Sequence, residues 1–193
     1  MLTFGPQYQI AKIPYTMTAL VLIVFVLLFV FVAIGSKKQK ENESRVQDSL
    51  NALGIAPESI LFKCNYLSGH PDIDESKEGL SIVKTNDRVS LYFIPYGLIT
   101  GDPVEHGSIQ SDAINNIVVE DKTTIEKRVT VGRLLLTGVF ALAWKKKKVD
   151  EAAYLVIEWK DGRFDHETVF EFAGKGSMQE ANAARNKLIK AVK

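Results

Sequence analysis

The hydrophobic positions divide the chain into one long apolar run and a following region of mixed pattern. Ala19–Ile34 contains no charged residue, and about 23 residues from Ile13 to Gly35 separate the strongly polar groups on either side. At about 1.5 Å of rise per residue, a helix of that length covers the roughly 30 Å hydrocarbon core of a bilayer. A strand in lipid would leave its amide groups unpaired, so the pattern predicts a transmembrane helix over residues 13–35.

Basic residues around the run indicate its orientation. One precedes it, Lys12, and four follow it closely: Lys37, Lys38, Lys40 and Arg45. The positive-inside rule then places residues 1–12 outside and the C-terminal part in the cytoplasm. The alternative is a cleaved signal peptide, because Ala33 and Gly35 are spaced as a cleavage site requires. Since the run exceeds the usual h-region of about 7–15 residues, we expect a retained single-pass anchor in the cell membrane.

Residues 36–56 follow as a polar segment with one short apolar stripe. Val46, Leu50 and Leu53 recur at helical spacing, and Gly54 is placed to end a helix. The pattern predicts a juxtamembrane amphipathic helix or linker. It either couples or dimerises the chain, or docks its stripe on the chain's own domain; the short stripe favours docking.

The region after residue 57 changes to strand-like periodicity. The β-rich runs are Ser59–Tyr66, Leu80–Lys84, Val89–Ile94, Ile114–Glu120, Tyr154–Lys160 and Glu167–Phe172. Turns are predicted at Thr85–Arg88 and at Asp161-Gly162-Arg163, and an exposed loop at Gly97–Gly107. In Val89–Ile94, we expect Val89, Leu91 and Phe93 to form one strongly apolar face.

An amphipathic helix is predicted at the C-terminus. Ser177 stands three residues before Glu180, which is the capping-box pattern. The apolar positions that follow at helical spacing are Met178, Ala181, Ala184, Leu188 and Val192. Such a helix can cover the open end of a bent antiparallel sheet or partial barrel, which indicates an α+β fold.

Composition narrows the functional classes. About 157 residues follow residue 36, enough for one domain with a real core. They hold all 23 acidic and 23 of the 24 basic residues, so the domain is nearly neutral, and we expect no nucleic-acid partner. The single cysteine, Cys64, excludes an internal disulfide and suits a reducing compartment.

One segment carries a family resemblance. Residues 117–148 contain Asp121-Lys122-Thr123-Thr124-Ile125-Glu126-Lys127-Arg128, then an apolar run to Trp144 and four lysines. With the strand pair ending in Phe170-Glu171-Phe172 and the last helix, this resembles short bacterial proteins with pleckstrin-homology-like (PH-like) domains. The resemblance covers residues 57–193. It implies a seven-stranded, strongly bent antiparallel barrel capped by the C-terminal helix, a fold that mostly binds lipids, peptides or proteins.

The run within this segment, Leu134–Trp144, is too short to span a bilayer, at about 16 Å as a helix. One interpretation is an interfacial anchor with its lysines on anionic lipid; the other is a buried strand or small hairpin of the barrel. The candidate membrane- or partner-binding residues are Arg133, Leu134, Phe140, Trp144, Lys145, Lys146, Lys147 and Lys148.

Catalytic chemistry has little support in the sequence. The three histidines, His70, His106 and His166, stand apart in turn-like segments, where a lone histidine is usually solvated. The acidic loop Asp72–Glu75 lacks the glycine and late glutamate of a calcium loop. We therefore expect no catalytic residue, no metal and no cofactor.

Two functions are consistent with these patterns. The first is a non-catalytic, membrane-anchored interaction or scaffold protein that presents a cytoplasmic PH-like domain to a protein partner or to a second copy. The alternative is a module that binds the membrane surface or a lipid through Arg133–Lys148. The bilayer is a partner in both, and anionic lipid is a partner in the second.

Overall fold

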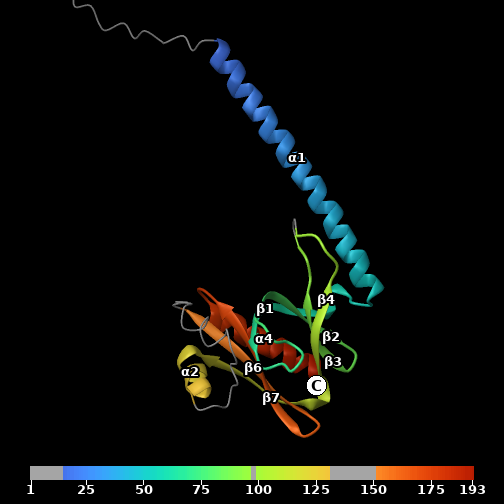
Figure 1. Cartoon of the computed structure of the whole chain (residues 1–193), viewed down its shortest axis with the longest axis vertical. Coiled ribbons are helices and arrows are strands. Elements are labelled where there is room, and N and C mark those ends of the chain that lie inside the picture. Colours follow the sequence, from blue (N-terminus) through green and yellow to red (C-terminus); the bar gives the residue numbers. More distant parts are fainter. Residues whose placement is uncertain (1–14, 97–98, 131–150) are drawn as a thin grey trace, which may run out of the picture.

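The structure is a computed structural model that describes residues 15–96, 99–130 and 151–193. A long helix, α1 (Tyr15–Ala52), projects from a bent β-sheet (Figure 1). The strands are β1 (Ile60–Ser68), β2 (Lys77–Thr85), β3 (Arg88–Phe93), β4 (Val104–Gln110), β5 (Ile114–Asp121), β6 (Ala152–Asp161) and β7 (Phe164–Ala173). Within the described residues, two further α-helices, α2 (Lys122–Thr130) and α4 (Ser177–Val192), join the sheet in the α+β architecture that the sequence predicts.

The sheet is antiparallel and strongly curled. Its order is β4-β3-β2-β1-β7-β6-β5, so β4 and β5 are the two edges of the described sheet. These edges are joined by the short 3-10 turn η2 (Ser111–Ala113), which with its flanking bonds spans at most about 14 Å. The edges of a flat seven-stranded sheet would lie about 29 Å apart, at about 4.8 Å per strand. The sheet therefore bends until its edges meet at this corner, an arrangement compatible with a PH-like fold.

Strand β1 connects the two halves of the sheet. It pairs with β2 and with β7, and its register shifts between Cys64 and Tyr66 and again between Tyr66 and Ser68. Such bulges bend a strand and increase its twist, which allows β1 to turn the corner between the halves.

The main core fills the concave side of the sheet and is closed by α4. Ala181, Ala184 and Leu188 of α4 are buried against it, as the C-terminal stripe predicts, whereas Met178 is exposed. The strand residues of this core include Tyr66, Leu80, Ile82, Leu91, Ile109, Leu155, Ile157 and Phe170. The Arg185 Nε also donates to the Ile117 carbonyl at 2.7 Å, which fixes α4 to β5.

The capping box predicted for this helix is wrong. The N-cap residue is Gly176, in a left-handed conformation, and Ser177 is already the first helical residue. The Ser177 N–H instead donates to the Gly174 carbonyl at 3.1 Å. Glycine adopts this conformation without steric cost, so the tight turn after β7 begins the helix one residue earlier than the serine pattern indicated.

Helix α1 is continuous from the apolar run through the predicted juxtamembrane helix. It ends in a Schellman motif: the Gly54 N–H donates to Asn51 and the Ile55 N–H to Leu50, at 3.0 and 2.9 Å. Val46 and Leu50 are buried on the chain's own domain, which confirms the docking interpretation. Leu53 was predicted to share the stripe but is 53% exposed, because the helix has ended before it. Within the described residues, no helix combines the length and apolarity needed to cross a membrane.

Helix α2 lies on the outer face of the sheet and was not predicted. Asp121, the last residue of β5, accepts the Thr124 N–H at 2.8 Å and so caps the helix. Ile125 is buried in a second cluster with Leu67, Tyr154, Val156 and Val169. The outer face of the β5–β7 half is therefore apolar as well.

Two strand predictions need correction. The loop expected over Gly97–Gly107 ends earlier, since β4 begins at Val104 and includes His106 and Gly107. Hydrogen bonding along the edge of β3 overrides the weak strand propensity of these residues. The opposite face of β3 is also buried rather than polar, because Tyr92 packs with Val46 and Leu50 of α1.

The turns between neighbouring strands agree with the sequence. Asn86 has φ +36° in the turn between β2 and β3, and Gly162 has φ +56° in the turn between β6 and β7. Both turns need a residue that tolerates positive φ, which the Asn-Asp and Asp-Gly patterns signal.

Candidate functional site

The N-terminal half of α1 presents an apolar surface on every side. From Val24 to Ile34, the large hydrophobic side chains are 46–77% exposed. A helix buried in a protein core or docked on one face would show a covered stripe, and these residues show none. The helix therefore projects from the domain with an apolar circumference that nothing in the described chain covers (Figure 1).

Polar contacts hold the next part of α1 against the loop between β3 and β4. The Asn42 Nδ2 donates to the Ile99 carbonyl at 2.7 Å, and Arg45 donates to the Gly101 carbonyl at 3.1 Å. Arg45 also lies 3.6 Å from the Asp102 carboxylate, whose oxygen accepts from the Ser49 hydroxyl at 3.3 Å. Asn42 is buried although it belongs to a helix that is otherwise exposed at this level. The loop is thus fastened to α1 over two turns of helix.

Apolar packing completes this attachment below the polar contacts. Val46 and Leu50 join Ile55, Val83, Tyr92 and Ile94 in a compact cluster on the outer face of β2 and β3. The Tyr92 hydroxyl donates to Glu105 at 3.2 Å, which anchors the ring at the rim of the cluster. Because α1 runs without a break from its exposed half into this docked half, no flexible linker separates the apolar segment from the domain.

The sequence-predicted candidate residues Arg133–Lys148 lie outside the described residues. The seven strands of the described sheet all come from other parts of the chain. Whether this segment is core or contacts the membrane therefore stays a prediction.

His70, expected to be a solvated loop residue, is buried instead. It is 4% exposed and bridges the loop between β1 and β2 to strand β4. The Asp72 N–H donates to its Nδ1 at 3.2 Å, so the ring proton resides on Nε2, which faces the Ser108 carbonyl at 3.2 Å. A Cβ on Gly107 would lie 2.6 Å from the ring, so the glycine makes room for the imidazole. In the sequence, the two glycines, Gly69 and Gly107, indicate the close packing at this site, whereas the histidine alone does not.

An aromatic stack extends from this histidine. Its ring centroid lies 5.5 Å from that of Trp159, which stacks in turn on His166 at 4.5 Å. The Trp159 Nε1 donates to the Thr168 hydroxyl at 2.8 Å. His70 thereby contacts both β4 and β6.

Burial governs the ionisation of this site. Desolvation lowers the pKa of His70, although the Ser108 carbonyl and the Asp72 carboxylate, 3.9 Å from Nδ1, favour the protonated form. Desolvation also raises the pKa of Tyr66 to about 12. The Tyr66 hydroxyl accepts the His70 N–H and donates to the Ile73 carbonyl. With these bonds satisfied by main-chain groups, the cluster fastens the loop between β1 and β2.

A buried tyrosine lies under α2 on the outer face. Burial, followed by the charges of Glu171 and Glu126, raises the pKa of Tyr154, and the Glu171 carboxylate shares a hydrogen bond with it. Glu171 itself is 4% exposed. This hydrogen bond gives the Tyr154 hydroxyl a polar partner at the edge of the apolar cluster.

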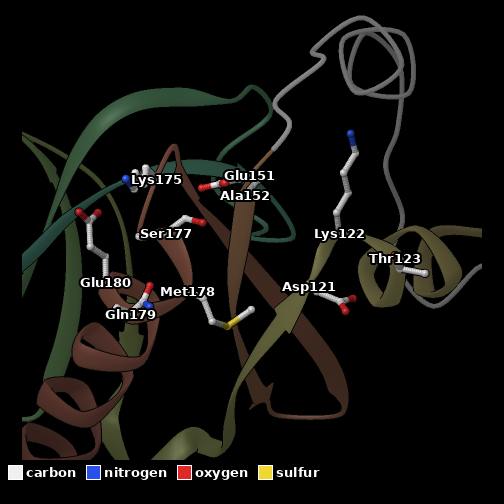
Figure 2. Close-up of a pocket in the computed structure, with 11 residues that line it drawn as sticks. Asp121, Lys122, Thr123, Glu151, Ala152, Lys175, Ser177, Met178, Gln179 and Glu180 are labelled. Atoms are coloured by element: carbon white, nitrogen blue, oxygen red, sulfur yellow. The ribbon is translucent and has the colours of Figure 1, made fainter.

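A hollow lies between α2, the start of β6 and the N-terminus of α4. It has a volume of about 790 Å³ and is open to one side. Figure 2 shows Lys122 and Asp121 on one wall and Lys175, Gln179 and Glu180 on the other, with Met178 between them. Asp121 already accepts from Thr124, which lowers the pKa of its carboxyl. The lining mixes acidic and basic groups, so its charge favours no ligand of either sign.

Candidate metal ligands do not cluster in the part of the chain that the structure describes. No group of three or more His, Cys, Asp or Glu side chains there could hold a metal ion. Cys64 is buried, and desolvation raises the pKa of its thiol well above the ordinary range, which keeps it protonated. The chain matches no protein-family model, and no curated protein matches it.

Proposed function

We propose that the protein is a single-pass membrane protein whose cytoplasmic β domain, of PH-like fold, is a non-catalytic interaction module that docks a protein partner at the membrane. The observation that carries this proposal is the apolar circumference of α1 over Val24–Ile34. The run continues in the sequence back to Ile13, before the first described side chain, and reaches the roughly 23 residues that a bilayer requires.

Lipid fits this surface better than a protein partner does. A partner helix or groove covers one face of a helix, so a helix with such a partner carries an apolar stripe on that face. Lipid contacts all faces of a helix equally. An exposed apolar surface of this extent is not sustained in water, because soluble proteins rarely expose more than a few hundred Å² in one patch. The lysines that follow, Lys37, Lys38 and Lys40, favour the cytoplasmic side for the domain.

The domain supplies surfaces for a partner close to the bilayer. Seven antiparallel strands with a C-terminal helix support the assignment to a PH-like fold. In the described sheet, the edge strand β4 pairs only with β3, and Val104 at its start is 48% exposed. An edge of this kind can accept a strand from another chain through main-chain hydrogen bonds.

The anchor is tested by membrane extraction of the full chain. We expect the protein to stay in the membrane pellet after alkaline carbonate and to need detergent for release. Val26→Arg with Phe29→Arg should lose this behaviour, since each charge costs about 2.5–3.5 kcal/mol at the centre of a span. Gln47→Arg, an exposed position on the same helix, is the matched control and should behave as wild type. Recovery of the intact wild-type chain without detergent, or a mature chain beginning near Ser36, would refute the anchor.

The interaction role is tested by cross-linking in native membranes followed by identification of the captured chains. We expect the domain to be captured with one protein partner or with a second copy. A domain that remains monomeric and uncaptured at its native level would contradict the role as an interaction module.

A further inference from the structure

We infer that Tyr96 and Ile99, in the connection between β3 and β4, form a second membrane contact and enter the lipid headgroup layer beside α1. This inference rests on the proposed membrane span, and it adds a site on the β domain that the span itself does not require.

Two apolar side chains are exposed in this connection of the β3–β4 hairpin. Tyr96 is 58% exposed and Ile99 is 43% exposed, on either side of residues 97–98, which the structure does not describe. The hairpin rises along α1 on the side from which the helix projects (Figure 1). Both residues therefore lie at the end of the domain that faces the proposed membrane.

The contacts with α1 set the height of this hairpin. The Ile99 carbonyl is hydrogen-bonded to Asn42, eight residues after Ile34, where the apolar run ends. At about 1.5 Å per residue, this contact lies about 12 Å along the helix from the edge of the hydrocarbon core. The headgroup layer on one side of a bilayer is about 5–7 Å thick, which leaves about 5 Å between the layer and the Ile99 main chain.

Side-chain length and helix tilt cover that remaining distance. A helix that leans toward the hairpin by about 20°, the average tilt of transmembrane helices, lowers a segment packed about 9 Å to its side by about 3 Å. An extended isoleucine or tyrosine side chain reaches further still. The headgroup layer is thus within reach of the exposed hairpin residues but not of the rest of the sheet.

The chemistry of the hairpin fits a headgroup layer. Tyrosine is enriched at this depth because its ring is apolar and its hydroxyl is polar. The Lys63 Nζ lies 5.0 Å from the centroid of the Tyr96 ring, so a cation accompanies the aromatic group. A lysine close to an anionic surface is attracted to lipid phosphates, which makes the pair suited to an anionic bilayer.

The test uses a fluorescent label on single cysteines in the full-length chain. The chain is reconstituted into vesicles of phosphatidylcholine and phosphatidylglycerol that carry a headgroup-level spin-labelled quencher. Ile99→Cys is the reporting variant, and Phe29→Cys reports on the span. Phe164→Cys is the matched control, because Phe164 is 71% exposed on the β6–β7 turn, away from α1 (Figure 1). Cys64 is buried and is left in place, and wild type gives the background labelling.

We expect the label at Ile99 to be quenched several-fold more strongly than the label at Phe164, and the label at Phe29 to show a lipid environment. A lipid signal at Phe29 with equal, weak quenching at Ile99 and Phe164 would overturn the hairpin contact and leave the proposed span intact. A water signal at Phe29 would overturn the span and, with it, the hairpin contact.

Discussion

Replacement of Leu50 by alanine tests whether α1 and the β domain form one rigid unit. Leu50 is 5% exposed in the cluster that docks α1 on β2 and β3, whereas Leu53, three residues later, is 53% exposed. The two substitutions remove the same atoms, Leu50 from the last turn of α1 and Leu53 from the position just after the helix ends. The two side chains differ in what surrounds them, so Leu53→Ala is the control for Leu50→Ala.

The structure gives the expected size of the difference. Buried Leu→Ala substitutions cost about 2–5 kcal/mol, and the cost rises with the cavity that remains. The Leu50 cluster contains six buried residues and lies on the outer face of the sheet, where neighbours can partly collapse, so we expect a value of about 2–3 kcal/mol. Leu53→Ala should change the free energy of unfolding by no more than about 0.5 kcal/mol, as is usual for exposed positions.

The assay is urea unfolding of residues 37–193, which retain the docked half of α1. Tryptophan fluorescence follows the transition, with Trp159 buried in the core. Equal losses from the two substitutions would refute the arrangement in which Leu50 is buried and Leu53 is exposed, and would support the sequence pattern, in which both leucines share one docked stripe. A loss below about 0.5 kcal/mol for Leu50→Ala would show that the helix is not docked in solution.

Three further outcomes are expected. The pKa of buried His70 is lowered, so the unfolded chain binds the proton first as pH falls below about 6.5. Wild-type stability should therefore be full above that pH and decline below it, and His70→Gln should flatten this slope in urea unfolding; an unchanged slope would contradict the assignment. Gly69→Ala should cost more than about 3 kcal/mol, since φ is +93° and the new methyl would overlap the Glu167 carbonyl, whereas Gly79→Ala, at positive φ but in open space, should cost about 1 kcal/mol in the same assay. The alternative lipid-binding function predicts that residues 37–193 float with anionic vesicles at low salt and that serine at Lys145–Lys148 abolishes this; no flotation would remove that alternative.

Local patterns predicted the parts of the fold that depend on neighbouring residues. The turns at Asn86 and Gly162 need positive φ, and the sequence signals such turns through short-range chemistry. Apolar residues spaced three and four positions apart predicted the C-terminal helix. Ala181 and Leu188 of this apolar stripe are buried, as the prediction requires. These features arise within a few residues of chain, so one sequence suffices to find them.

Features that depend on distant contacts were missed. Strand β4 contains His106 and Gly107, which have weak strand propensity, and it forms only because β3 offers a partner along its whole length. His70 is buried because Gly107 and Ser108, almost forty residues later, leave space and a carbonyl for its ring. The second face of β3 is buried because the C-terminal half of α1 packs against it. The spacing of residues along the sequence does not predict any of these contacts.

The Schellman motif at Gly54 and the contacts of Asn42 and Arg45 leave α1 without a joint where it meets the sheet. If its apolar half is held in a bilayer, the helix acts as a lever whose arm, from the middle of Val24–Ile34 to Leu50, is about 32 Å. A change in tilt of about 20°, within the range by which spans adapt to bilayer thickness, would swing the domain sideways by about 11 Å. The thickness of the surrounding membrane would then determine which way the domain faces.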